Sequence, residues 1–264
     1  MTYDLDALNY VANVLADEAR TAILPYFRKG NLTTENKMRN GYDPVTVADR
    51  AAEEVMRRVL ACLRPNDAIV GEEFGITEGS SGLTWVLDPI DGTRGFVAGT
   101  PTWGVLIAVG PKSGPILGII DQPYIGERFV GCGGVATLFG PHDTKIIRTR
   151  SGRKLSDAIL FTTFPEIGTL QDRAAFEAVA AQTQLVRYGM DCYAYALVAA
   201  GQIDLVIETG LNNYDIQAPI ALIEAAGGIV TDWCGNPVHQ GGRVIAAANF
   251  EIHKEVLQIM GHLE

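Results

Sequence analysis

The sequence predicts an α+β fold made of two successive parts, and three observations carry this prediction. Apolar residues recur at helical spacing up to about residue 63. Short segments rich in β-branched and aromatic residues then follow one another, separated by Gly, Pro and Asp, which is typical of an antiparallel sheet. Beyond about Lys145 strands and helices alternate, as in α/β proteins. We therefore predict an N-terminal α+β half over residues 1–144 and a C-terminal α/β half over residues 145–264.

Two helices are predicted at the start of the chain. The first covers residues 4–29, and Pro25 is expected to kink or end it because proline lacks a backbone donor. The second is expected to begin with Asp43 as its cap and Pro44 at the first helical position, and to end near residue 63. Asp49 lies off the predicted buried face of this helix, so core packing does not account for it. That face is expected to consist of Val47, Ala51, Val55 and Val59.

The remaining elements follow in order along the chain. In the first part, strands are predicted over residues 68–71, 84–87, 103–109, 116–121, 128–130 and 136–139, with a loop over residues 77–82. In the second part, strands are predicted over residues 159–162, 185–188, 204–208 and 244–247. Helices are predicted there over residues 170–183, 191–200, 214–226 and 250–261. Each strand of the second part thus precedes one helix, which is the α/β alternation.

The composition restricts the class of protein. The chain has 264 residues, and its 47% hydrophobic content allows a substantial core. Acidic residues outnumber basic ones by 31 to 21, which argues against nucleic acid as a partner because its phosphates would be repelled. No stretch approaches the roughly 20 apolar residues of a membrane span, and the acidic start does not look like a signal peptide. We expect a cytoplasmic protein with no membrane partner.

The cysteine spacing and two missing nucleotide-binding patterns exclude several classes of site. The four cysteines are far apart and form no CxxC pair, so neither a zinc site nor a disulfide framework is expected, and we predict reduced, mostly buried thiols. Neither a GxGxxG pattern nor a phosphate-binding P-loop is present, which argues against a redox or nucleotide-binding enzyme.

The most informative segment runs from Trp85 to Phe96. A strand-like apolar run stops at Asp88, Pro89 bends the chain, and Asp91 follows before a turn opened by Gly92. Two carboxylates at this spacing can converge on one hard cation, while the amides of the turn face an anion. This arrangement suits metal-assisted chemistry on a phosphate ester.

Further carboxylates stand at the ends of predicted elements. Glu72 follows the strand over residues 68–71, and Asp215 lies near the start of the helix over residues 214–226. Taken singly, each would be read as a cap, a turn residue or a solvated charge. Taken together, four carboxylates without a neighbouring histidine favour Mg²⁺ over zinc, since Mg²⁺ prefers oxygen ligands. Two such cations can activate water and stabilise the leaving alkoxide.

Four motifs, in this order along the chain, resemble those of the inositol monophosphatase family. The family usually has tryptophan before its late aspartate, where this chain has Tyr214. The resemblance implies a layered α-β-α-β-α sandwich of the inositol monophosphatase and fructose-1,6-bisphosphatase type, and a magnesium-dependent phosphatase that is commonly a homodimer. The motifs are Val45-Thr46-Val47-Ala48-Asp49, Gly71-Glu72-Glu73, Asp88-Pro89-Ile90-Asp91-Gly92-Thr93, and Tyr214-Asp215 followed by Ala225-Ala226-Gly227-Gly228.

The same resemblance implies roles for individual residues. Two or three Mg²⁺ ions are expected to be bound by Glu72, Asp88, the carbonyl of Ile90, Asp91 and Asp215. Asp49 and Thr93, together with Glu72, are expected to be catalytic, and the first two would orient or deprotonate the attacking water. The backbone amides of Gly92 and Thr93 are expected to hold the phosphate.

Other segments resemble the histidinol-phosphate phosphatases of this family more than its inositol phosphatases. Arg94-Gly95-Phe96 replaces the usual Thr-Asn-Phe, and the segments 71–75, 188–195 and 213–219 agree with this branch. Histidinol phosphate carries an amine and an imidazole that is partly cationic near neutrality. Asp191 and Glu208, the latter matching the family's sugar-alcohol-binding glutamate, are expected to pair with these groups.

Three further residues are candidates for contacts with the substrate. Asn213 is expected to hydrogen-bond the imidazole ring. Arg94 and Arg187 are expected either to contact the phosphate or to form structural pairs. Asp191 has an alternative interpretation as the cap of the helix that follows it.

The first hypothesis is therefore a Mg²⁺-dependent hydrolysis of L-histidinol phosphate to L-histidinol and phosphate, a step of histidine biosynthesis. The alternative is the same chemistry on inositol 1-phosphate or a related sugar-alcohol phosphate. A hypothesis of another class is a non-catalytic dimer that senses metal or phosphate. This hypothesis is less favoured, because every position that matches a metal ligand of the family has a suitable residue in this chain.

Overall fold

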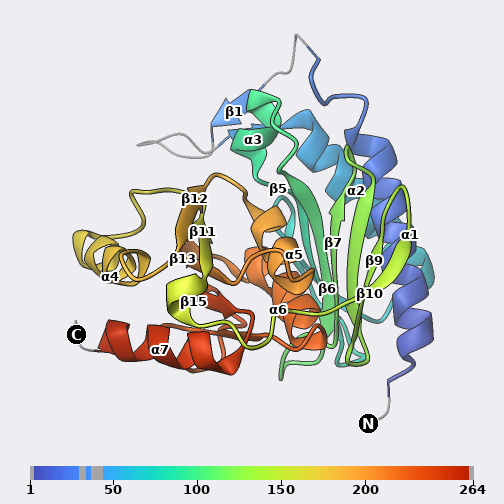
Figure 1. The fold of residues 1–264 in the computed structure, drawn as a ribbon. Coiled ribbons are helices and arrows are strands. Elements are labelled where there is room, and N and C mark those ends of the chain that lie inside the picture. Colours follow the sequence, from blue (N-terminus) through green and yellow to red (C-terminus); the bar gives the residue numbers. More distant parts are fainter. Residues whose placement is uncertain (1–2, 30–33, 37–43, 262–264) are drawn as a thin grey trace.

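The computed structural model describes residues 3–29, 34–36 and 44–261, and it shows five layers in the order α-β-α-β-α (Figure 1). A pair of helices covers the outer face of an eight-stranded sheet, a second pair lies between this sheet and a five-stranded sheet, and a third pair covers the far side. In this order the helices are α1 (Leu5–Ile23) and α2 (Val47–Leu63), α5 (Cys192–Ala199) and α6 (Asn213–Ala225), and α4 (Leu170–Ala180) and α7 (Phe250–Gly261). The predicted layered sandwich is confirmed.

The eight-stranded sheet has the order β10-β9-β8-β7-β6-β5-β3-β4. All of its neighbouring strands are antiparallel except β3 and β5, which run parallel. The sequence predicted six of these strands and missed the two at the edges, β4 and β10. The strands are β3 (Ala68–Gly71), β4 (Gly75–Thr77), β5 (Thr84–Asp91), β6 (Gly104–Gly110), β7 (Leu117–Gln122), β8 (Glu127–Cys132), β9 (Val135–Phe139) and β10 (Thr144–Ile147).

The five-stranded sheet is mixed and has the order β12-β11-β13-β15-β14. β11 runs parallel to β12 and β13, whereas β15 is antiparallel to β13 and β14. The four predicted strands and four predicted helices of this part are present, and β14 is an addition. The strands are β11 (Ile159–Thr162), β12 (Leu185–Tyr188), β13 (Leu205–Leu211), β14 (Ile229–Thr231) and β15 (Gly242–Ala247).

Shorter elements complete the chain. A two-stranded ribbon precedes α2, a short helix follows β5, and a 3₁₀ turn precedes β11. They are β1 (Thr34–Asn36), β2 (Pro44–Thr46), α3 (Thr93–Ala98) and η1 (Leu155–Asp157). The predicted division at residues 144 and 145 stays a prediction; β10 lies across it and pairs with β9 of the first part.

The predicted start and buried face of the second helix were wrong. Pro44 lies in β2, Asp43 lies outside the described residues, and α2 begins only at Val47. Thr46 caps the helix instead, because its hydroxyl accepts a hydrogen bond from the helix while the Asp49 carboxylate accepts one from the Thr46 backbone. The buried face of α2 is therefore shifted by one residue from the predicted face, and it includes the carboxylates of Asp49 and Glu53. Its buried residues are Ala48, Asp49, Ala52, Glu53, Met56 and Leu60.

The first helix ends at Ile23, just before a turn that contains Pro25, so the prediction that Pro25 would kink or end this helix is confirmed and the bound at residue 29 was wrong. All four cysteines are free, but Cys62 and Cys234 are exposed, so the expectation of mostly buried thiols holds for only part of them. Among the described helices, none combines the length and the apolar character needed to cross a membrane.

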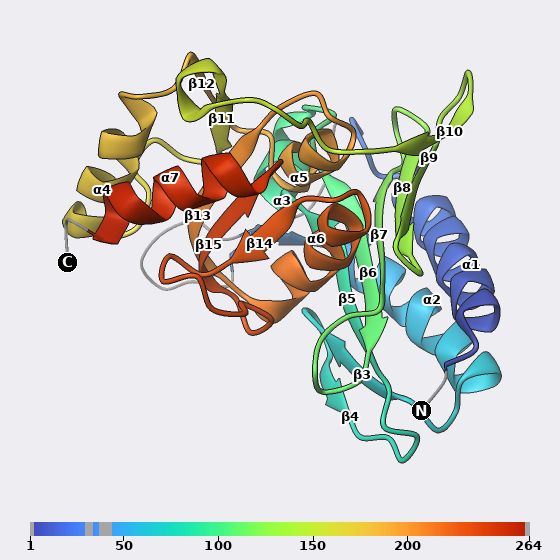
Figure 2. The same ribbon diagram turned by 60° about the horizontal axis from the view of Figure 1, so that its bottom comes forward.

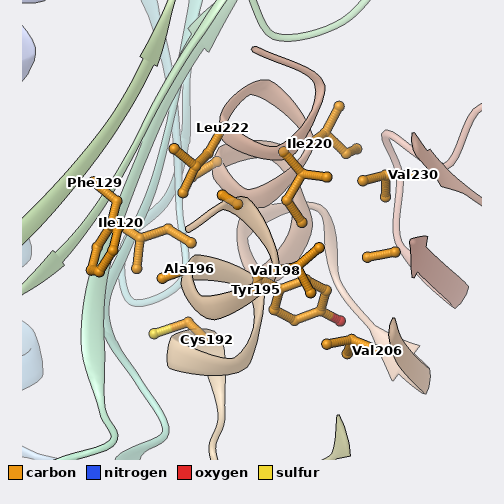
Figure 3. Packing of buried hydrophobic residues seen from close by; sticks show 14 of the residues in the cluster. Ile120, Phe129, Cys192, Tyr195, Ala196, Val198, Val206, Ile220, Leu222 and Val230 are labelled. Carbon is orange, nitrogen blue, oxygen red and sulfur yellow. The ribbon is translucent and has the colours of Figure 1, made fainter. Parts of the chain in front are cut away.

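The central helix layer joins the two sheets into one continuous core. Figure 3 shows Ile120 and Phe129 of the first sheet, Leu222 of α6, and Val206 and Val230 of the second sheet packed around α5 and α6. α5 is rich in alanine, which lets it lie close to its neighbours (Figure 2). The ends of strands and helices that meet beside this layer are therefore held in fixed relative positions.

Candidate active site

Two carboxylates reach the site from β5 because this strand contains a bulge. β5 does not end at Asp88, as the sequence predicted, but continues through Pro89 to Asp91. Its pairing with β6 shifts between Asp88, opposite Leu106, and Asp91, opposite Gly104. In a regular strand, side chains three residues apart point to opposite faces. The extra residue of the bulge brings both carboxylates to the same side.

Two more carboxylates come from the first turns of helices. Asp49 in α2 and Asp215 in α6 occupy the same position, three residues after the cap, and each accepts a hydrogen bond from the backbone of its cap residue. The Asp49 bond from Thr46 measures 2.8 Å, and the Asp215 bond from Asn212 measures 2.6 Å. In both cases Oδ2 makes this bond, so the helix start fixes the orientation of the carboxylate. In Asp49 the other oxygen, Oδ1, lies near the Thr93 hydroxyl.

These elements bring an acidic cluster together. Carboxylate oxygens of Asp88, Asp91 and Asp215 all lie within 4.8 Å of one another. Glu72 follows β3, lines the same cavity and lies close enough for its charge to raise the pKa of Asp88. The structure thus unites the four carboxylates that the sequence predicted as metal ligands, and the Ile90 backbone lines the cavity beside them.

The cluster is electrostatically strained in the absence of a cation. Burial is the main reason why the pKa of Asp88 lies well above its ordinary value, and the charges of Glu72 and Asp91 add to this shift. Burial, followed by the charges of Asp191 and Asp215, raises the pKa of Asp91 in the same way. Burial also raises the pKa of Asp215 to about 7. A divalent cation would remove this repulsion, and a donor set of oxygen atoms alone fits Mg²⁺.

The residues predicted to be catalytic lie beside this cluster. The Thr93 hydroxyl lies 3.0 Å from the Ile90 carbonyl oxygen and 3.4 Å from Oδ1 of Asp49. Burial raises the pKa of Asp49 to about 6, although its hydrogen bonds from Thr46 oppose this shift. A carboxylate with such a pKa can accept a proton near neutrality. The roles of Asp49, Thr93 and Glu72 in activating water stay predictions.

Gly92 is required by two features of the turn after β5. Its φ of 81° lies in the left-handed region, where it caps the short helix α3. A Cβ at this position would also lie 2.8 Å from the side chain of Asp191. The sequence predicted that the backbone amide of Gly92 holds the phosphate, and the structure adds the contact with Asp191.

A cavity of about 320 Å³ extends from the acidic cluster toward the second sheet. Glu208 in β13 is buried there and accepts hydrogen bonds from Tyr195, at 2.9 Å, and from both the backbone and the hydroxyl of Thr163. Burial raises the pKa of Glu208. The sequence analysis gave neither Thr163 nor Tyr195 a role in the site, because these contacts join segments far apart in the chain.

Asp191 stands at the start of α5, but its side chain makes no capping hydrogen bond to that helix. Its backbone has φ 48° and ψ −144°, which is a costly conformation for a residue with a side chain. The carboxylate accepts a hydrogen bond from Thr102 at 3.1 Å. Burial raises the pKa of Asp191, whereas this bond and the nearby Arg94 lower it. The structure therefore does not support the alternative interpretation of Asp191 as a side-chain cap.

The other predicted substrate residues are placed differently. Arg94 lines the cavity, with its guanidinium 4.9 Å from the centre of the Phe164 ring. Arg187 is exposed on β12, and Asn213 is the first residue of α6; neither belongs to the residues that line the cavity. Contacts of these two residues with a substrate stay predictions.

One backbone contact that the sequence did not indicate links the two halves of the site. The N–H of Cys192, the first residue of α5, donates a hydrogen bond of 2.6 Å to Oδ2 of Asp91. It restricts the orientation of the Asp91 carboxylate, which belongs to the acidic cluster. The central helix layer thus holds a carboxylate of the first sheet in place.

Comparisons with known proteins agree with this site. The family model described as "Inositol monophosphatase family" matches residues 4–262. The chain is 42% identical to the bifunctional phosphatase IMPL2 of Arabidopsis thaliana, across 97% of this chain and 75% of the relative. It is 34% identical to a histidinol-phosphatase of Streptomyces coelicolor, across 94% of each chain. The solved inositol monophosphatase of Zymomonas mobilis superposes with a TM-score of 0.85 at 36% identity, covering 98% of this chain and 100% of that one. A match over nearly the full length, in sequence and in fold, shows that the chain belongs to the inositol monophosphatase family.

Proposed function

We propose that this phosphatase of the inositol monophosphatase family hydrolyses L-histidinol phosphate to L-histidinol and phosphate with the help of Mg²⁺. Glu72, Asp88, Asp91 and Asp215, with the Ile90 carbonyl, would hold two or three ions. Bound ions of this kind activate water and stabilise the leaving alkoxide. The number of ions, a cytoplasmic homodimer and a place in histidine biosynthesis are part of the same proposal.

The position of Asp191 carries the choice of substrate. Its carboxylate packs directly on Gly92, whose amide is expected to hold the phosphate. In histidinol phosphate the carbon that bears the amine is bonded to the carbon that bears the phosphate ester. A carboxylate beside the phosphate site therefore lies where the ammonium group would be, and a charged pair in a largely buried cavity is favourable. An inositol ring has only hydroxyl groups at the corresponding distance.

The similarity to a histidinol-phosphatase supports this choice, and the similarity to an inositol monophosphatase supports the alternative, inositol 1-phosphate or a related sugar-alcohol phosphate. Steady-state release of phosphate from the two esters, measured side by side with excess Mg²⁺, separates the two proposals. We expect kcat/KM to be at least about 100-fold higher for histidinol phosphate, because polar groups placed for an amine discriminate strongly. Equal or faster hydrolysis of the inositol ester would contradict the proposal.

Replacing Asp191 by Asn is expected to raise KM for histidinol phosphate by about 10–100-fold, since a hydrogen bond to a charged group contributes about 1.5–3 kcal/mol. Asparagine tolerates a positive φ, so the backbone of the helix start should be preserved. Hydrolysis of inositol 1-phosphate, if measurable, should change much less. The exposed Asp157 provides a matched control as Asp157→Asn. Unchanged kinetics in Asp191→Asn would remove this residue from the substrate site.

A further inference from the structure

Glu53 is a buried carboxylate that is not one of the proposed metal ligands or catalytic residues. It lies on the inner face of α2 and is 0% exposed. Its Oε2 accepts a hydrogen bond of 2.7 Å from the backbone N–H of Glu73. Its Oε1 accepts hydrogen bonds from the N–H of Phe74 at 3.1 Å and from Nε of Arg57 at 2.7 Å. Both oxygens are therefore engaged, and two of the donors belong to the turn that follows Glu72.

The end of β3 is shaped around this carboxylate. A Cβ on Gly71 would lie 2.0 Å from Oε1 of Glu53, so only glycine fits there without displacing the carboxylate. On the other side, the N–H of Glu72 donates to the carbonyl of Leu87 in β5 at 3.2 Å. The backbone of Glu72 is thus fixed by a hydrogen bond to β5 at its own N–H, and by hydrogen bonds to Glu53 at the next two N–H groups.

Arg57 extends this contact to the next strand. Its guanidinium donates to the carbonyl of Gly75 and, at 2.9 Å, to the hydroxyl of Thr77. Both residues lie in β4, the edge strand of the sheet, whose one neighbour among the described strands is β3 (Figure 2). A turn at such an edge has few partners of its own. The Glu53–Arg57 pair therefore ties the whole β3–β4 hairpin to α2, the helix that also carries Asp49.

We propose that Glu53 is a positioning residue, which fixes the turn over residues 72–74 so that the Glu72 carboxylate faces Asp88 before a metal ion binds. A ligand that is already in place loses less conformational freedom on binding, so the affinity for the ion depends on this contact. The inference rests on the proposed function only in taking Glu72 as a metal ligand. It does not depend on which phosphate ester is the substrate.

The variant Glu53→Gln tests this role. Glutamine keeps the shape of the side chain, but its single acceptor oxygen cannot serve all the donors, and its NH₂ group opposes an N–H of the turn. We expect the Kd for Mg²⁺, measured by calorimetry on metal-free protein, to rise by about 10–100-fold. We also expect hydrogen exchange at the amides of Glu73 and Phe74 to become at least about 10-fold faster without metal.

Glu54→Gln is the matched control, because Glu54 is the exposed neighbour on the same helix. It should leave both the Kd and the exchange rates unchanged. Faster exchange with an unchanged Kd would overturn the proposal, and so would unchanged exchange. If Glu53→Gln does not fold, Glu53→Asp, which keeps the charge but is too short to reach the turn, should show the same two changes. A wild-type protein that binds Mg²⁺ but prefers inositol 1-phosphate would overturn the substrate assignment alone and leave this inference intact.

Discussion

Replacement of Asp91 by Asn is expected to lower kcat/KM for phosphate release by about 10³-fold or more, which corresponds to a loss of about 4 kcal/mol of transition-state stabilisation. Asp91 contributes an oxygen to the cluster with Asp88 and Asp215. Its Oδ2 accepts the hydrogen bond from the backbone N–H of Cys192. Asparagine has one oxygen instead of two and no negative charge. Its NH₂ group would therefore stand where the wild type offers an oxygen to the Cys192 N–H or to a metal ion, which prefers carboxylate ligands.

The measurement compares initial rates of phosphate release over a series of Mg²⁺ concentrations. Asp143→Asn is a suitable control, because Asp143 is exposed in the loop between β9 and β10 and far along the chain from the site. Its rate should match that of the wild type. Circular dichroism should show that both variants are folded. An Asp91→Asn variant with more than about a tenth of the wild-type kcat/KM would exclude Asp91 as an essential metal ligand.

The prediction of the fold worked where each element carries its own periodic signal. The strand over residues 159–162 and the helix over residues 250–261 were predicted with their observed bounds, since both have clear apolar patterns. The predicted start of α2 was wrong because two possible cap residues lie within a few positions of each other. Asp43-Pro44 looks like a helix start, but Thr46 and Asp49 form a capping box, a pattern that is also visible in the sequence.

The part of the site that could be predicted consists of residues in local motifs near the ends of strands and helices. Glu72, Asp88 and Asp215 were expected to converge from separate elements, and the structure brings them to one cavity. The conformation of Asp191 was not predictable: its φ is positive, and its side chain packs against Gly92, a residue about 100 positions earlier in the chain. Contacts of this kind depend on tertiary structure, for which a single sequence contains no local signal.

The stability of the metal-free protein is expected to fall as the pH rises from about 5 to about 7.5, and Mg²⁺ should reverse this loss. Asp49 and Asp215 have ordinary pKa values near 3.8 in the unfolded chain and values of about 6 and about 7 in the folded protein. Below about pH 4 both states hold these protons, so the groups impose no penalty. At higher pH the unfolded chain releases them first, and the folded state loses free energy relative to it until the pH passes the folded pKa.

The size of this effect follows from the shift at a single group. For Asp49, a shift of about 2 units corresponds to about 3 kcal/mol of folding free energy at high pH. The acidic cluster of Asp88, Asp91 and Asp215 acts in the same direction, because its pKa values are also raised. His253 acts in the opposite direction, because burial lowers its pKa and its protonation below about pH 6.5 disfavours the fold.

Urea unfolding at about pH 5 and about pH 7.5, with EDTA and with excess Mg²⁺, measures this balance. Asp49→Asn removes one of the titrating carboxylates while His253 stays in place, so the difference between variant and wild type isolates the carboxylate contribution. Its metal-free stability should depend less on pH than that of the wild type. Mg²⁺ competes with protons for the cluster and binds only the folded protein, so it should stabilise the wild type by several kcal/mol more at the higher pH. A metal ion that binds carboxylates with raised pKa values must displace their protons, so its stabilising effect has to depend on pH. Equal stabilisation of the wild type by Mg²⁺ at both pH values would therefore show that the buried carboxylates are not its ligands.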